Sequence, residues 1–483
     1  MNLDFLAVAP LVAIGGAVVL LLLVDVQFQP GPRWWAVAAA LGIGGATIAS
    51  ALQWAEHAGG GKLFFGDMIS IDGFSAFAGL VIYPLAGLAL MSGWSLVRTL
   101  PRRGAEFVVL VLIAASGAHL MAGSADLVML FVSLEVFSIS LYVLAGFTRE
   151  RARSDEAALK YFLLGALASA VFLYGVALVF AATGTTSMYG ARDFLEGTLI
   201  LRPGILLAGT ALLLVGLGFK VSAAPFHVWA PDVYQGAPGG VVGFLASSAK
   251  VGGFAAMARV LTVALESRID DWRPALAVLA ALSIVIGTLF ALAQTDLKRM
   301  LAYSSVAHAG FIMTALVAGG GGVDDMWFYV ATYAVQTVGA FAVVSIVSGP
   351  RSAPAPLTDY AGLAVRSPFL AASLGLMMVA MGGIPLTAGF AGKVAVFRAA
   401  IDADHLWLVI VGVVATVAGL FFYLRVIVLM YMQEPVLGPG TPEAGPRTGI
   451  VGRVSLGIAA LVTVALGVAP WPLLDWLRDA VPL

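Results

Sequence analysis

Long apolar runs alternate with short polar segments along the whole chain. A membrane-spanning helix needs about 20 mostly apolar residues, and we count fourteen runs of roughly that length. The pattern therefore predicts an all-α polytopic membrane protein with about 14 transmembrane helices. Their expected ranges are 5–24, 34–53, 74–97, 106–122, 125–147, 157–183, 203–230, 238–265, 274–293, 299–318, 326–347, 367–397, 405–432 and 450–470.

The seventh run, 203–230, contains Pro225 and Pro231 close behind Lys220. Proline removes a backbone donor and crowds the preceding turn. We expect both prolines to interrupt this helix and to leave its last turns irregular. Because lipid cannot satisfy the freed backbone groups, the broken helix should be interior, with Lys220 facing protein or water.

The twelfth run, 367–397, is interrupted in a similar way by Gly382, Gly383 and Pro385 before Lys393. It follows the seventh run by five helices, and a five-helix unit that repeats returns with inverted topology. We therefore expect one membrane domain, 1–483, built on two inverted five-helix repeats, each with a broken helix. Its expected parts are helices 1–3 in 1–105, repeats at 106–265 and 274–432, and a last helix at 450–470.

Composition agrees with a membrane location, because 61% of the residues are hydrophobic and only 11% are charged. Soluble domains carry about a quarter charged residues. The chain has no cysteine, which excludes disulfides, thiolate metal sites and iron–sulfur ligation. It has no glycine-rich phosphate loop, and its net charge of −1 gives no indication of nucleic acid. Redox cofactors and nucleotides are expected elsewhere.

Basic residues in loops favour the inner side of a membrane. With the N-terminus outside, the inward loops collect Arg33, Arg98, Arg102, Arg103, Arg149, Arg151, Arg153, Lys298, Arg299, Arg351, Arg366, Arg447 and Arg453. The outward loops hold fewer: Lys62, Arg192, Arg202, Arg268, Arg273, Arg398 and Arg478. This bias predicts that both termini lie outside. The remaining basic residues fall within apolar runs: Lys160, Lys220, Lys250, Arg259, Lys393 and Arg425.

A charged side chain inside a membrane is costly and is a functional candidate by default. Glu135 lies halfway along 125–147 with no basic residue one turn away. Paired with Glu135, Lys220 would stay charged, so a change of partner would change its proton affinity. Lys250 and Lys393 could extend the same chain of proton-exchanging groups.

Other ionisable residues leave two interpretations open. Lys160 follows Glu156 by four residues, so it suits an ordinary helical ion pair as well as a proton path. His308 and His227 are either proton shuttles or packing residues. Arg259 and Arg425 cannot relay protons, and we expect them to clamp partners or to extend to the membrane surface.

The run FKVSAAPFHVWAPDVYQGAP at 219–238 resembles the broken-helix signature of the antiporter-like subunits of respiratory complex I, in the form found in subunit N. Further matches are LYVLAG at 141–146, EAALKYFLLGALASA at 156–170, LKRMLAYSSVAHAGF at 297–311, GIPLTAGFAGK at 383–393 and YLRVIVLMY at 423–431. The resemblance covers about residues 100–432. One departure is the stretch from Gly239 to Val242, where the family usually has a Thr-Pro-Val-type sequence.

The resemblance implies a proton relay through Glu135, Lys160, Lys220, Lys250 and Lys393, with His227 and His308 as further candidates. It also implies a proton-translocating subunit of an NADH:quinone oxidoreductase in a bacterial plasma membrane. NADH, FMN, iron–sulfur clusters and quinone would bind partner subunits, and M-like and K-like subunits would be neighbours. The alternatives are a subunit of a multi-subunit sodium/proton antiporter and a scaffold that does not pump. Sodium would need clustered oxygen ligands, and we see no second intramembrane carboxylate beside Glu135.

Overall fold

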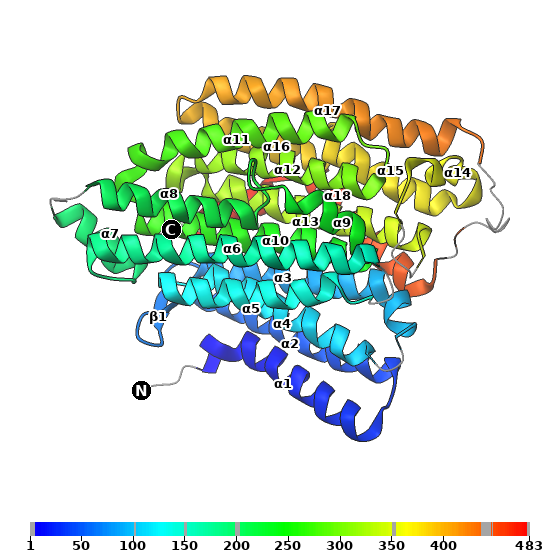
Figure 1. The fold of residues 1–483 in the computed structure, drawn as a ribbon, viewed down its shortest axis with the longest axis horizontal. Helices are drawn as coiled ribbons and strands as arrows, with labels where there is room; N and C mark the ends of the chain where they lie inside the picture. Colours follow the sequence, from blue (N-terminus) through cyan, green and yellow to red (C-terminus); the bar gives the residue numbers. More distant parts are fainter. Residues whose placement is uncertain are drawn as a thin grey trace.

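The computed structural model describes residues 5–100, 103–148, 152–198, 203–349, 354–435, 446 and 448–480. Long helices lie side by side along the longest axis of the molecule (Figure 1). The expected all-α membrane fold is confirmed, with one small β-hairpin added. Six arginines used to predict the orientation lie outside the described residues: Arg102, Arg149, Arg151, Arg202, Arg351 and Arg447.

Twelve helical segments in the described part of the chain are long and apolar enough to cross a membrane. They contain α1 Phe5–Phe28, α2 Pro32–His57, α3 Gly73–Arg98, α4 Gly104–Gly123, α5 Leu127–Ala145, α6 Ala152–Thr183, α8 Pro203–Lys220, α10 Gly239–Arg259 with η1 Val260–Ala264, α11 Ile269–Leu292 with η2 Glu266–Arg268, α13 Val323–Val347 with η3 Gly319–Gly322, α17 Leu406–Met432 and α18 Ile450–Val468. The other two expected ranges contain α12 Leu297–Leu316 and the pair α15 Pro368–Gly382 and α16 Ala388–Asp402. The total of 14 and the inverted repeat stay predictions.

The break in the seventh expected helix is confirmed around Pro225, but not at Pro231. Helix α8 ends at Lys220, and a new helix, α9, begins at Trp229 and runs to Gly236. Pro225 lies in the irregular segment between them, whereas Pro231 lies in the first turn of α9. The expectation that Pro231 interrupts the helix is wrong, because the first turn of a helix does not need the missing backbone donor.

The break in the twelfth expected helix is confirmed. Helix α15 ends at Gly382, and Gly383 follows in the left-handed conformation with φ +81°. Helix α16 begins at Ala388, after Pro385. Glycine is the residue that tolerates this conformation without strain, so the C-terminal cap of α15 is encoded locally.

Helix α10 forms the centre of the molecule, and every residue from Gly239 to Arg259 is buried. It packs against α3, α4 and α13. A Cβ at Gly239 would lie 3.0 Å from Ser345 Cα, and one at Gly240 would lie 2.7 Å from Gly93 Cα. The departure from the family sequence thus coincides with a close approach of backbones that larger residues would prevent.

Several smaller elements were not expected, because they are too short or too polar to resemble spans. They are the antiparallel hairpin β1 Lys62–Phe64 and β2 Ile69–Ile71, and helices α7 Met188–Gly197, α14 Leu363–Arg366 and α19 Trp471–Ala480, with a single turn, η4, at Leu357–Tyr360. Figure 1 shows β1 and α7 at one end of the bundle and α9 and α14 at the other. We call these the α7 end and the α9 end.

Candidate functional site

Lys220 is the last residue of α8, and its side chain points into the protein as expected, with 3% of its surface exposed. Its Nζ donates a hydrogen bond to Ser138 Oγ at 2.6 Å and lies 4.4 Å above the ring centre of Phe137. Both partners are on α5. The lysine that ends the broken helix is therefore held by a hydroxyl group and an aromatic face.

Glu135 lies on α5 one turn before Ser138 and is half-buried. Its Oε1 accepts a hydrogen bond from Ser169 Oγ of α6. The charges of Glu135 and Lys220 lie close enough to act on each other, but no ion pair joins them among the described residues. The two expected partners are thus neighbours without direct contact.

Lys250 lies in the middle of α10 and is almost completely buried, with 1% of its surface exposed. Its Nζ donates to the backbone oxygen of Val221, the first residue after α8 ends. A helix that ends leaves its last carbonyl groups without intrahelical donors. The break in the helix therefore supplies the acceptor for Lys250 and brings it next to Lys220.

Lys393 repeats this arrangement at the second broken helix. Its Nζ donates to the backbone oxygens of Met381, at 3.3 Å, and Gly382, at 3.1 Å. These carbonyls are at the C-terminus of α15, where the helix dipole carries partial negative charge. The ammonium also lies 4.8 Å above the ring centre of Phe311.

His308 lies on α12 and is buried. Its Nδ1 is 2.9 Å from the hydroxyl of Tyr329, and its Nε2 is 3.1 Å from the hydroxyl of Tyr423. The Tyr423 hydroxyl is also 2.5 Å from Ser304 Oγ. This network was not expected, because its members come from α12, α13 and α17.

Together these residues form a row, which we define as Glu135, Lys220, Lys250, His308 and Lys393. Lys250 and Lys393 both lie close enough for their charges to act on His308. None of the three lysines makes an ion pair with a carboxylate among the described residues. Because their hydrogen-bond partners are neutral, a proton can leave or return without breaking an ion pair.

Lys160 does not join this row. It lies on α6 at the α9 end, where its Nζ is 2.8 Å from both Glu156 Oε1 and Asp232 Oδ2. Asp232, on α9, also accepts from Arg299 Nη1 at 2.7 Å. Burial raises the pKa of Asp232, but hydrogen bonds and charges from Lys160 and Arg299 hold it below its usual value. The helical ion pair is confirmed, and the relay role stays a prediction.

The ion pairs of Lys160 border a cavity of about 210 Å³ at the α9 end. It is lined by Glu156, Ala157, Lys160, Asp232, Gln235 and Gly236. His227 lies in the break before α9 and is half-buried, and its Nδ1 has no hydrogen-bond partner in the described part of the chain. It is outside the row, although the charge of Lys250 acts on it.

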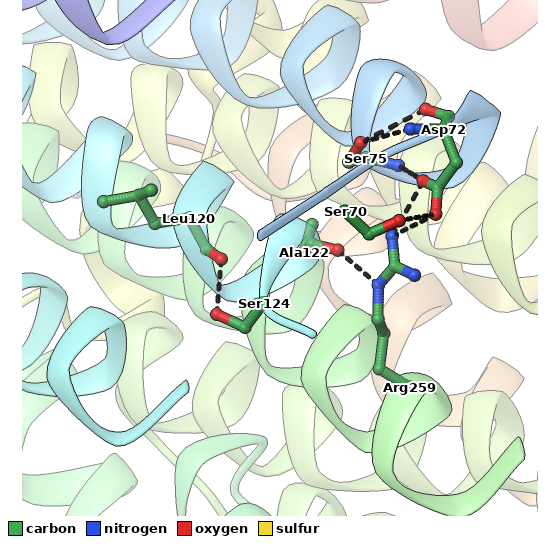
Figure 2. A network of polar contacts seen from close by, with 7 residues as sticks. All are labelled: Ser70, Asp72, Ser75, Leu120, Ala122, Ser124 and Arg259. Carbon is green, nitrogen blue, oxygen red and sulfur yellow. Dashed lines mark hydrogen bonds and ion pairs between the residues drawn. The ribbon is translucent and has the colours of Figure 1, made fainter. Parts of the chain in front are cut away.

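Arg259 clamps a partner, in line with the first of its two expected roles. Figure 2 shows its guanidinium facing the Asp72 carboxylate: Nη2 donates to Oδ1 and Oδ2 at 2.7 Å each, and Nε donates to the Ala122 oxygen at 2.6 Å. Burial raises the pKa of Asp72. The charge and hydrogen bonds of Arg259, with hydrogen bonds from Ser75 and Ser70, lower it by more, so the pKa lies below its usual value. This ion pair fixes the hairpin against α10.

Arg425, on α17, binds the backbone oxygens of Leu292 and Gln294, at 3.3 and 2.6 Å, and so covers the end of α11. Lys298 was expected in a loop, but it lies in the first turn of α12 and is completely buried. Its Nζ donates to the Ala237 oxygen at 3.2 Å. The placement of Lys298 in a loop is therefore wrong, because α12 begins before its apolar run.

Known proteins resemble this chain over most of its length. Residues 124–419 match the family described as NADH:quinone oxidoreductase/Mrp antiporter, TM. A protein named NADH-quinone oxidoreductase subunit N from Mycobacterium tuberculosis (strain CDC 1551 / Oshkosh) is 46% identical over 82% of this chain and 75% of its own. One of the same name from Parafrankia sp. (strain EAN1pec) is 38% identical over 98% of this chain and 94% of its own.

Solved structures also resemble this chain over nearly its whole length. A chain of respiratory complex I from Thermus thermophilus with bound aureothin has a TM-score of 0.82 and 36% identity, covering 98% of this chain and 100% of that one. A chain of the Mrp complex from Dietzia sp. DQ12-45-1b has a TM-score of 0.87 at 21% identity, covering 99% and 97%, and shows a shared fold. The chain therefore belongs to the family of NADH:quinone oxidoreductase and Mrp antiporter membrane subunits, within which it groups with the relatives named NADH-quinone oxidoreductase subunit N.

Proposed function

We propose that this chain is a proton-translocating subunit of an NADH:quinone oxidoreductase and that its buried row carries the protons. NADH oxidation and quinone reduction, with FMN and iron–sulfur clusters, take place in partner subunits. Conformational and electrostatic changes in neighbouring membrane subunits, of the M and K types, drive this one. The complex lies in a bacterial plasma membrane, with both termini of the chain outside.

The observation that carries this proposal is the way in which three lysines are buried. Lys220, Lys250 and Lys393 are each at most 5% exposed, and each donates to a hydroxyl or to backbone oxygens. A scaffold would gain more stability from apolar residues at these positions, because a buried charge without an opposite charge is costly. The cost is explained if the lysines gain and lose protons.

The arrangement also explains how one proton transfer can influence the next. At an effective dielectric of about 20, unit charges about 7 Å apart interact by roughly 2.4 kcal/mol. That energy corresponds to nearly two units of pKa. Protonation of one member of the row therefore changes the proton affinity of its neighbour enough to move a proton along.

The pair at the start of the row provides a test. Glu135→Gln and Lys220→Ala should each reduce proton pumping and coupled quinone reduction in the assembled complex, because each removes one of two charges that act on each other. The measurement is protons moved per NADH oxidised in membrane vesicles, with assembly checked separately. Lys62→Ala is the control, since Lys62 is an exposed lysine of β1.

Two outcomes separate the candidate functions. Reduced pumping in both variants, with normal pumping in the control, supports the relay. Wild-type pumping in both variants would leave the chain as a scaffold. The antiporter alternative is not favoured, since two relatives that match 98% and 92% of this chain are named NADH-quinone oxidoreductase subunit N.

A further inference from the structure

Asp325 is a buried carboxylate that the row does not include. It lies in the first turn of α13 and is 5% exposed. Its carboxylate makes no hydrogen bond or ion pair among the described residues. Its oxygens are not completely enclosed, so water can supply the hydrogen-bond partners that a mostly buried carboxylate needs.

Asp325 lies beside the last members of the row. Tyr329 follows it by four residues on α13, and residues at this spacing share one face of a helix, about 6 Å apart. The hydroxyl of Tyr329 is 2.9 Å from His308 Nδ1. The same tyrosine packs against α16 next to Lys393, because a Cβ on Gly392 would lie 2.9 Å from its ring. One water molecule can bridge a gap of one helical turn.

On its other side Asp325 faces the charged surface of the α7 end. The groups whose charges act on it are Asp324 of its own helix, Arg398 and Asp402 of α16, and Arg478 of α19. They form ion pairs, with Arg478 Nε 3.2 Å from Asp324 and Arg398 Nε 3.7 Å from Asp402. Arg398 and Asp402 are exposed. Asp325 is therefore the buried carboxylate between the row and a solvated cluster.

The cluster around Asp325 lies at one defined end of the molecule. Helix α13 begins directly after η3, which contacts η1, and η1 packs against α7. Asp325 therefore lies at the α7 end, while Asp232 and its cavity lie at the α9 end. In the orientation predicted from the basic residues, the α7 end faces outward.

We propose that Asp325 is the proton-release group of this chain. This inference rests on the proposed function and adds the place where the proton leaves. The ionised carboxylate accepts a proton that the His308–Lys393 part of the row gives up, and becomes a neutral acid. It then passes that proton to water at the α7 end, which restores the carboxylate. Arg398 and Arg478 stabilise the ionised form, whereas Asp324 and Asp402 stabilise the protonated one.

The test is proton pumping per NADH in assembled complex that carries Asp325→Asn. Asparagine has the same shape and keeps polar atoms but cannot carry the proton. Pumping should fall to the level of Lys393→Ala, and the double variant should fall no further, because both residues serve one path. Asp325→Glu should restore pumping. The matched control is Asp193→Asn, an exposed carboxylate of α7 at the same end of the molecule.

A second variant separates proton release from a structural role. Asp325→Leu replaces a buried carboxylate by an apolar side chain of similar size. If the role of Asp325 were only structural, complex with this variant would assemble and pump normally. A release group would lose pumping in both the Leu and the Asn variants. Wild-type pumping by either variant overturns this inference. If Lys220→Ala is impaired in the same assay, the proposed function stands while the exit through Asp325 does not.

Discussion

At the residue scale, the molecule holds buried positive charges in two different ways. The arginine Arg259 has a carboxylate partner, Asp72, whereas the lysines Lys220, Lys250 and Lys393 have neutral oxygen partners. The candidates could be found from the sequence, because a charge in an apolar run is conspicuous. Their partners could not, since Lys220 and Ser138 are 82 residues apart in the chain and meet through tertiary packing.

The Arg259 clamp gives a prediction about stability. Arg259→Lys keeps the charge but cannot reach both the Asp72 carboxylate and the Ala122 oxygen with one planar group. We expect the free energy of unfolding to fall by roughly 1.5–3 kcal/mol, the usual contribution of a hydrogen bond to a charged group. The measurement is faster amide hydrogen exchange around residues 72–75.

The control for this variant is Arg268→Lys, which changes an ion pair with Asp271 at the protein surface. Exposed pairs contribute about 0–1 kcal/mol, so the control should leave hydrogen exchange at residues 72–75 unchanged. Equal exchange in both variants would show that the Arg259 clamp does not stabilise the hairpin.

At the scale of elements, the two helix breaks position the row. Apolar length and proline or glycine content were enough to predict both breaks. The exact end of α8 at Lys220 was not predictable, because Ser283 Oγ of α11 accepts the backbone N–H of Ala224 and fixes the irregular segment from a distance. The expected helix 326–347 begins three residues after the observed start of α13 at Val323, so Asp325 was not predicted to be buried.

The second break gives a prediction at this scale. Gly383→Ala would place a residue with a side chain in the left-handed backbone conformation, which costs about 1–2 kcal/mol of folding free energy. Its Cβ would also lie 2.9 Å from Lys393 Cδ and 3.1 Å from Nζ. We expect displacement of Lys393 and reduced proton pumping per NADH in the assembled complex.

Gly349→Ala is the matched control for this change. Gly349 has a similar φ of +75°, but a Cβ there would meet none of the described residues within 4 Å. This variant shares the backbone strain without contact to the row, so its pumping should stay normal. Equal effects of the two substitutions would mean that strain, not the position of Lys393, is responsible.

At the scale of the whole molecule, the expected membrane fold is present, and α10 at its centre contacts both parts of the first broken helix, α8 and α9. The orientation in the membrane stays a prediction from the loop arginines and lysines. Periodicity could not show the hairpin, α7 or α19, because short polar elements at the ends of a bundle lack the long apolar runs that identify spans. Tertiary contacts stabilise them instead, as the Asp72–Arg259 pair does for the hairpin.

The absence of cysteine allows a direct test of orientation. Two variants, Lys62→Cys in β1 and Glu156→Cys at the α9 end, each carry one cysteine. Cells with either variant can be treated with a maleimide that does not cross membranes. The predicted orientation requires labelling of Lys62→Cys in intact cells and of Glu156→Cys only after the membrane is opened. The reverse pattern would place the α7 end, and the proposed release group, inside.

The central claim is that the buried lysines exchange protons instead of supplying fixed charge. Arginine keeps the positive charge but does not release its proton in proteins. The decisive measurement is protons pumped per NADH oxidised in vesicles that contain assembled complex with Lys220→Arg or Lys250→Arg, beside the surface control Lys62→Arg. We predict normal assembly and strongly reduced pumping for the two buried variants, and wild-type pumping for the control. Full pumping by both Lys220→Arg and Lys250→Arg would contradict the relay and leave these lysines as fixed charges.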